Sequence, residues 1–287
     1  MRAMPRCFLL ALLGFAPSEL SGQTSTPSTP PPPAPGIQDN SFLVEEAYNQ
    51  EEGVVQHISG FTRLWPSKVW AYTFTQEWPV NPQPRHQLSY TIPVVSPGDP
   101  SGAGIGDVAL NYRYQLVGNS SAKVAFSPRL SVLLPTGDYR LGRGAGGTGV
   151  QINLPLSVVV NQKLVTHWNA GTTLVPSARD PLGNRAATYG YNLGHSFIWQ
   201  VHPRFNAMLE TAWTGSELVV APGQTKRQHS LLVNPGIRWA FNFSSGLQIV
   251  PGIAVPIGVG PSRGEKGIFL YLSFEHPFGS KEGKRKK

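Results

Sequence analysis

The stretch GVQINLPLSVVVN, residues 149–161, alternates apolar and polar side chains almost without interruption. Its apolar members are Val150, Ile152, Leu154, Leu156, Val158 and Val160, and its polar members are Gln151, Asn153 and Ser157. Successive side chains of a β-strand point to opposite faces of the sheet. This period of two therefore predicts a strand with one apolar face and one polar face.

The same alternation recurs through the middle of the chain, most clearly in residues 104–117, 123–134 and 231–243. Counting such stretches predicts about twelve strands. They are expected near residues 53–65, 68–78, 86–95, 104–117, 122–134, 147–160, 163–175, 186–201, 204–215, 228–243, 246–259 and 266–278.

The length of these strands favours a membrane barrel over a β-sandwich. Strands of ordinary globular proteins are about 5–6 residues long, whereas a tilted transmembrane strand needs about 9–11. Most of the predicted strands are longer than the globular value. We therefore expect an all-β fold, a transmembrane antiparallel up-and-down β-barrel of about 12 strands over residues 53–278.

Composition excludes two other classes of protein. The chain of 287 residues has 31 Gly and 27 Pro and a mean hydropathy of −0.16, and its longest apolar run, 7–16, is about half the roughly 20 residues of a spanning helix. A bundle of membrane helices is thereby excluded. Hydrophobic residues make up 40% of the chain, which is too many for wholesale disorder.

The two ends of the chain predict export and a modular organisation. Residues 1–22 have the basic start, short apolar run and small residues of a secretory signal peptide, and 23–36 form a Pro/Ser/Thr-rich linker. Residues 37–52 are expected to be a cap, a plug or simply an ordered lead-in to the barrel. Residues 279–287 form a basic tail. The predicted location is the cell outer membrane.

Loops and prolines give further expectations. Long loops are predicted at 96–103, 135–146, 176–185, 215–227 and 260–265, and short turns at 118–121, 161–162, 202–203 and 244–245. Six prolines fall inside predicted strands, where each removes a hydrogen-bond donor, so either a locally irregular wall or some misplaced strand ends are expected. They are Pro93, Pro128, Pro155, Pro235, Pro251 and Pro256.

The polar faces of the strands are expected to line the lumen. A barrel of about twelve strands lies between the filled eight-stranded and the open sixteen-stranded kinds, so a narrow pore and a plugged lumen are both left open. The lumen-lining candidates are Asp107, Asn111, Arg113, Arg129, Asn153, His167, Glu210, Arg238 and Glu275. The three arginines either favour anions in the pore or pair internally with the acidic candidates. No cofactor and no metal site is expected.

Two short motifs carry a resemblance to a known family. Gly104-Ile105-Gly106-Asp107 is followed about thirty residues later by Leu134-Pro135-Thr136-Gly137-Asp138, each at the outer end of a long strand. The pair resembles outer-membrane β-barrel transporters of the phenol-degradation meta pathway (MetA-like), over roughly residues 86–278. The resemblance implies an outer-membrane pore for small molecules, including aromatic or hydrophobic ones. The glycines suit tight turns, and the two aspartates suit the rim.

The expected partners are outer-membrane lipid, the barrel-assembly machinery and a small-molecule solute, and not nucleic acid, because the basic residues gather in the tail. The closing stretch 267–278 resembles the C-terminal signal read by that machinery, although nine residues follow it. The oligomeric state stays open.

Three other functions compete with a channel. The barrel could act as a structural or surface-interaction protein through its loops, or the chain could be an exported soluble β-sandwich. It could also be an outer-membrane lipid hydrolase, because His57-Ile58-Ser59 places a His and a Ser two residues apart on one face. No acidic partner for this pair can be assigned, so the chain is not expected to be an enzyme.

Overall fold

The computed structural model describes residues 37, 40–80, 83–98 and 101–278, which all belong to one compact unit, 32–287. The predicted signal peptide, linker and basic tail lie outside the described residues. Within the described part of the chain, no helix is long and apolar enough to cross a membrane.

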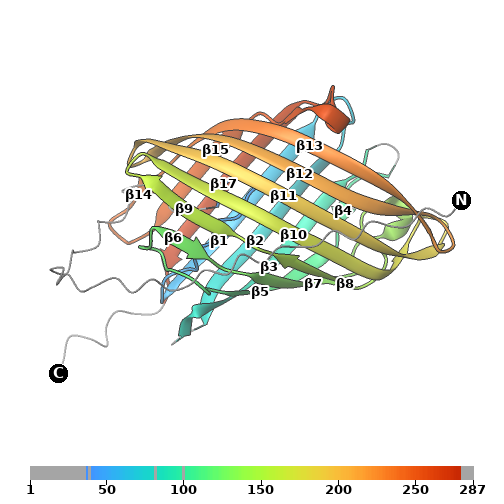
Figure 1. The fold of residues 1–287 in the computed structure, drawn as a ribbon, viewed down its shortest axis with the longest axis horizontal. Helices are drawn as coiled ribbons and strands as arrows, with labels where there is room; N and C mark the ends of the chain where they lie inside the picture. The colour runs from blue at the N-terminus through green and yellow to red at the C-terminus, as the bar shows by residue number, and fades with distance from the viewer. Residues whose placement is uncertain (1–36, 38–39, 81–82, 99–100, 279–287) are drawn as a thin grey trace, which may run out of the picture. The chain divides into compact units, whose positions relative to one another are not determined.

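The strands form one closed antiparallel sheet (Figure 1). Five of the twelve predicted crossings are interrupted, which gives seventeen strand segments among the described residues. The crossings are β1 (Val54–Leu64), β2 (Trp70–Val80), β3 (Gln83–Ser96), β4 with β5 (Gly104–Ile105, Val108–Tyr114), β6 with β7 (Val124–Phe126, Arg129–Leu134), β8 with β9 (Gly149–Asn153, Leu156–Asn161), β10 (Leu164–Arg179), β11 (Arg185–His202), β12 (Phe205–Ala221), β13 with β14 (Gln224–Trp239, Phe241–Asn242), β15 with β16 (Gln248–Ala254, Ile257–Gly258) and β17 (Gly267–Pro277).

Closure comes from pairing of the last strand with the first. β17 pairs with β1 from Val54↔Pro277 to Leu64↔Gly267, and it also pairs with β15. A closed sheet has no unpaired edge, which is the condition for a sheet to span hydrocarbon. The prediction of an up-and-down barrel of about twelve strands is confirmed.

Proline accounts for three of the interruptions. Pro128 separates β6 from β7, Pro155 separates β8 from β9, and Pro256 separates β15 from β16. The carbonyl groups at these breaks still accept hydrogen bonds, because Tyr114 N lies 3.0 Å from the Pro128 oxygen and Ser127 N lies 3.2 Å from the Pro155 oxygen. Pro93, Pro235 and Pro251 remain inside paired strands. The expected irregular wall is therefore real, and proline lies at three of its five interruptions.

The two faces of the wall differ as the alternation predicts. In β5, Leu110 and Tyr112 are exposed on the outside while Asn111 and Arg113 are buried on the inside. Apolar side chains are likewise exposed on the outer face of the other strands, including Leu130, Val150, Ile152, Trp168, Leu193, Phe197, Trp199, Leu209, Ile237 and Leu270. This outer belt is suited to contact with lipid chains.

The connections fall at two ends. We call the end at which β1 begins the turn end, and the opposite end the loop end. At the loop end, residues 135–148 connect β7 to β8 and contain the 3-10 helix η1 (Tyr139–Leu141), and residues 259–266 contain η2 (Gly260–Ser262).

The long loop predicted at 215–227 is wrong. β12 continues to Ala221 and β13 begins at Gln224, so the connection is two residues long. Glu217 and Arg227 face one another across these strands, with Arg227 Nη2 2.7 Å from Glu217 Oε1. The end of β12 is a continuous apolar run, Leu218–Ala221, and the start of β13, Gln224–His229, is polar. Neither shows the alternation on which the prediction of strands rests, so the sequence favours a loop there.

Candidate functional site: the lumen

A stretch of chain ahead of β1 lies inside the barrel. Of residues Asn40–Gln50, here called the lumen segment, nine are buried, and Leu43 and Glu45 are partly buried. The lumen segment has no strand or helix of its own. Its backbone groups therefore need partners from the wall, because an unpaired buried peptide group is costly.

Alternate amides of the lumen segment donate to side chains on different strands. The donor–acceptor pairs are Leu43 N to Glu210 Oε1 on β12 (3.0 Å), Glu45 N to Asn169 Oδ1 on β10 (2.9 Å), Ala47 N to Ser157 Oγ on β9 (2.8 Å) and Asn49 N to Gln115 Oε1 just after β5 (2.9 Å). In extended chain every second amide points the same way. The polar wall thus replaces a neighbouring strand as the hydrogen-bond partner.

Carbonyl groups of the same segment accept from the wall. Asn169 Nδ2 donates to the Glu45 oxygen at 2.9 Å, and Arg113 Nη1 donates to the Tyr48 oxygen at 3.1 Å. Arg238 donates to the Asn40 oxygen and, at 3.3 Å, to the Ile37 oxygen. Arg238 is therefore bound to backbone rather than presented to a solute.

Ion pairs fix the middle of the lumen segment. Glu45 lies 2.6 Å from Arg129 and 3.5 Å from Arg113, and Arg113 in turn lies 4.0 Å from Glu77 on β2. The two arginines and two glutamates balance each other's charge. Within this cluster Arg113 and Arg129 are therefore matched by carboxylates and do not present unpaired positive charge to the central cavity.

An aromatic side chain anchors the start of the segment. The Phe42 ring centroid lies 5.5 Å from that of Phe269 and 5.7 Å from that of Tyr271, both on β17. Gly236 and Gly252 lie beneath the ring, and a Cβ atom at either position would come within 2.5 Å of a Phe42 ring carbon. The two glycines create the room that Phe42 occupies.

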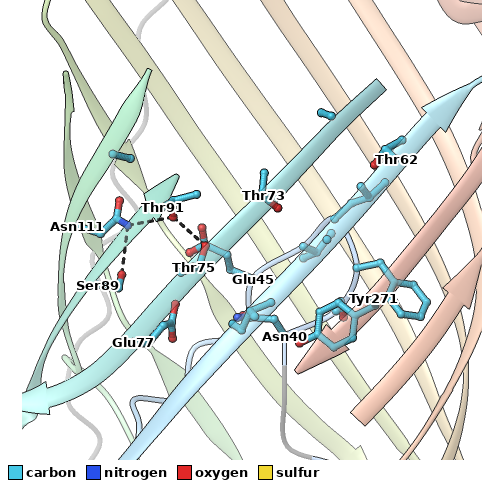
Figure 2. Close-up of a pocket in the computed structure, with 18 of the residues that line it drawn as sticks. Asn40, Glu45, Thr62, Thr73, Thr75, Glu77, Ser89, Thr91, Asn111 and Tyr271 are labelled. Carbon is cyan, nitrogen blue, oxygen red and sulfur yellow. Dashed lines mark hydrogen bonds between the residues drawn. The ribbon is translucent and has the colours of Figure 1, made fainter. Parts of the chain in front are cut away.

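A cavity of about 440 Å³ lies beside the lumen segment (Figure 2). Hydroxyl groups line much of it, and several are bonded to one another: Thr75 Oγ1 lies 2.8 Å from Thr91 Oγ1, and Asn111 Nδ2 donates to Ser89 Oγ at 3.2 Å. Phe42, Ile58, Phe269 and Tyr271 supply apolar walls. The cavity can therefore hold a small molecule with both polar and apolar parts.

Two further cavities lie towards the ends of the barrel. The cavity at the loop end measures about 520 Å³ and shares Ala71 with the central one. The cavity at the turn end measures about 370 Å³, and none of its lining residues lines the central cavity. Asn49 and Gln50 of the lumen segment line the turn-end cavity, whereas Asn40–Glu45 line the central one. The lumen segment thus lies between the two.

The structure places most lumen-lining candidates on the inner face. Asn111, Arg113, Asn153, His167, Glu210 and Arg238 are buried there, and Arg129 is mostly buried. Glu275 lies near the turn end of β17 and pairs with Gln56 and Gln248 in register. Asp107 instead binds backbone amides of the β7–β8 connection. Four further side chains bind the lumen segment: Ser157, Gln115, Gln87 and Ser196. The sequence did not single them out because they are uncharged and belong to no motif.

The two motifs meet at the loop end. Asp107 Oδ1 accepts from Gly137 N at 3.0 Å, and its Oδ2 accepts from Ala145 N at 2.7 Å. Thr136 Oγ1 donates to the Gly106 oxygen at 2.6 Å and accepts from Val108 N at 3.0 Å. Gly104 packs against Arg143, and Pro135 is exposed beside Thr136. The motif residues therefore fasten the β7–β8 connection to the start of β5.

Asp138 has a local role in the same connection. Its carboxylate accepts from Arg140 N at 2.9 Å and caps η1, and its backbone oxygen accepts from Arg143 N at 3.0 Å. Capping of this kind satisfies amides at the start of a helical turn.

His57 and Ser59, the pair considered for a lipid hydrolase, contact other side chains. His57 Nε2 lies 3.3 Å from His276 Nε2, and Ser59 Oγ lies 3.1 Å from the Tyr72 hydroxyl. Within the described residues, no cluster of three or more His, Cys, Asp or Glu side chains is placed to hold a metal ion.

Comparisons with known proteins identify a family and similar solved structures. The family described as "Putative MetA-pathway of phenol degradation" matches residues 34–273. The crystal structure of the COG4313 outer membrane channel from Pseudomonas putida F1 is 17% identical, with a TM-score of 0.54 over 81% of this chain and 98% of that chain. The NanC porin is 8% identical, with a TM-score of 0.49 over 79% of this chain and 100% of that chain. No curated protein sequence matches.

Proposed function

The chain belongs to the MetA-pathway family of phenol degradation, and from this premise we propose that it is an outer-membrane channel for passive passage of small solutes. The fold is shared with the COG4313 outer membrane channel, which supports this location and role. The solutes are small molecules that combine an apolar body with polar groups, aromatic ones among them. Outer-membrane lipid surrounds the wall, and the barrel-assembly machinery inserts it.

One observation carries the proposal: solute-sized space lies in the lumen and at its loop end. Cavities of about 520 and 440 Å³ have Ala71 in both of their linings. Volumes of roughly 300–1,000 Å³ are typical of pockets for small molecules. A purely structural barrel has no need of such internal space.

The lumen segment is the element that restricts passage. It lies between the central and turn-end cavities, and side chains of the wall hold its amides in place. We infer that residues 40–50 act as a plug, and that conduction requires them to shift. The resting channel is therefore nearly closed.

Planar-bilayer recording tests the proposal. The wild-type protein is expected to give small and infrequent current steps. The double variant Phe42→Ala, Glu45→Gln, which loses the aromatic anchor and the ion pairs, is expected to give larger or more frequent steps. Thr73→Arg, which fills the central cavity, is expected to reduce them. If neither the wild-type protein nor the double variant gives steps, the barrel is not a channel.

A further inference from the structure

The loop-end cavity contains two arginines that have no carboxylate partner in the part of the chain that the structure describes. Arg143 comes from the β7–β8 connection and Arg179 from the end of β10, and both line the cavity. Among the described residues, neither guanidinium lies within ion-pairing distance of a carboxylate. This distinguishes them from Arg113 and Arg129, which are paired with glutamates deeper in the lumen.

The acidic groups nearby are bound to other partners. Glu217 lines the same cavity, but it accepts from Arg227 at 2.7 Å and from Tyr189 N at 3.1 Å. Asp180 accepts from Asn184 Nδ2 at 2.7 Å and from Leu182 N at 3.0 Å. Asp107 is held by the amides of the β7–β8 connection. None of these three carboxylates is paired with Arg143 or Arg179, so neither guanidinium is neutralised by direct contact with them.

The two arginines are held in place by the rest of the connection. Arg143 donates to the Ser101 oxygen and lies against Gly104, where a Cβ atom would overlap its guanidinium. The Arg179 guanidinium lies 5.3 Å from the centre of the Tyr139 ring, and Arg179 N donates to the Ala145 oxygen at 2.8 Å. The Nε atoms of both arginines are buried without a hydrogen-bond partner in the described structure. Their positions are thus set before any ligand arrives.

The remainder of the cavity wall is largely apolar. Val69, Ala71, Val95, Ala178 and Val219 line it. Fixed guanidinium groups bind carboxylates through charge-assisted hydrogen bonds, and an apolar wall favours a ligand with an apolar body. Inorganic anions satisfy the first feature but not the second.

We propose that the loop-end cavity is a binding site for organic monocarboxylates with an apolar body, such as aromatic acids, in which Arg143 and Arg179 bind the carboxylate. The biological role of this site rests on the proposed function: a solute that enters from the loop end would bind here first. Binding itself does not require that the barrel conduct.

Isothermal titration calorimetry on the full folded protein in detergent tests binding apart from conduction. Benzoate is the probe, phenol is its uncharged counterpart, acetate has the charge without the ring, and phosphate is an inorganic anion. Benzoate is expected to bind at least ~10-fold more tightly than the other three. Equal binding of benzoate and phenol, tighter binding of phosphate, or no binding of benzoate at millimolar concentration would overturn the proposal.

Variants locate the site. Arg179→Gln is expected to weaken benzoate binding ~10-fold or more, and Arg143→Gln is expected to do the same. Because Arg143 also supports the β3–β4 connection, Arg179→Gln is the decisive variant. Arg263→Gln is the control, since Arg263 is exposed at the loop end and does not line the cavity. An equal loss in the control would show that the effect is one of overall charge and would refute the site.

Discussion

Arg129 Nη2 lies 2.6 Å from Glu45 Oε1, and this ion pair joins β7 of the wall to the middle of the lumen segment. The two residues are 84 positions apart in the chain. Glu45 keeps 27% of its side chain exposed to the central cavity, so the pair is both a structural contact and part of the cavity surface. Loss of this contact should therefore first affect the position of the lumen segment inside the barrel.

Glu45→Gln should loosen the lumen segment. We expect the free energy that holds the lumen segment against the wall to fall by about 1–3 kcal/mol. This is less than for a fully buried ion pair, because Glu45 is partly exposed. The measurement is the rate of maleimide labelling of Ala47→Cys, since Ala47 is fully buried and Cys7, the only native cysteine, belongs to the predicted signal peptide. Labelling should accelerate several-fold. Glu51→Gln, an exposed neighbour, should leave the rate unchanged, and equal rates in both variants would contradict the prediction.

Gly252→Ala should destabilise the barrel through Phe42. The new Cβ atom would lie 2.5 Å from a Phe42 ring carbon, and overpacking of this kind costs about 1–3 kcal/mol. The measurement is urea unfolding in detergent micelles for the single variants and for the pair with Phe42→Ala. Gly252→Ala should cost at least ~1 kcal/mol less when Phe42 is absent. Additive costs would show that the ring does not lie where the structure places it.

Asp107→Asn should release the β7–β8 connection. The carboxylate accepts two backbone amides, and each hydrogen bond to a charged group is worth about 1.5–3 kcal/mol. Trypsin should then cleave the folded protein at Arg140 or Arg143 faster than it cleaves the wild type. Asp138→Asn, which removes the charge of the residue that caps the three-residue helix η1, should have the smaller effect. The prediction fails if the order of the two variants is reversed.

Leu193→Arg should impair the barrel on its outer face. Leu193 lies near the middle of β11 with its side chain exposed, and an arginine facing lipid at mid-depth costs about 2–4 kcal/mol. Urea unfolding from lipid vesicles measures the loss. Thr73→Arg, which points into the central cavity, should be tolerated far better. Equal stability of the two variants would mean that Leu193 does not contact hydrocarbon.

The wall of the barrel could be predicted from sequence because its cause is local. Alternation such as that of 149–161 needs no knowledge of distant residues, and it correctly gave the strands and their inner and outer faces. The hairpin of β12 and β13 shows the limit, because its β12 end is apolar without alternation and its β13 end is polar. The pairing of Glu217 with Arg227 across it is not visible in such a pattern. Strand ends outside the apolar belt were accordingly the least accurate.

The contents of the barrel could not be predicted in the same way. Leu43 N binds Glu210, which is 167 residues away, and Ala47 N binds Ser157, which is 110 residues away. The alternation along each strand identifies the side chains that face the lumen. It does not identify which of them bind one another, the lumen segment or a solute. The arginine pair at the loop end was missed for a related reason, because it lies outside the alternating stretches and its closeness depends on how the β7–β8 connection folds.

The chain order of the lumen segment constrains how the protein is assembled. The segment leads directly into β1, and the pairing of β1 with β17 closes the barrel. Its partners lie on strands that come much later in synthesis, β9, β10 and β12 among them. The segment can therefore reach its bound position only after those strands have formed. Filling of the interior thus does not follow the order of the chain, because residues that come early in synthesis depend on partners that come late.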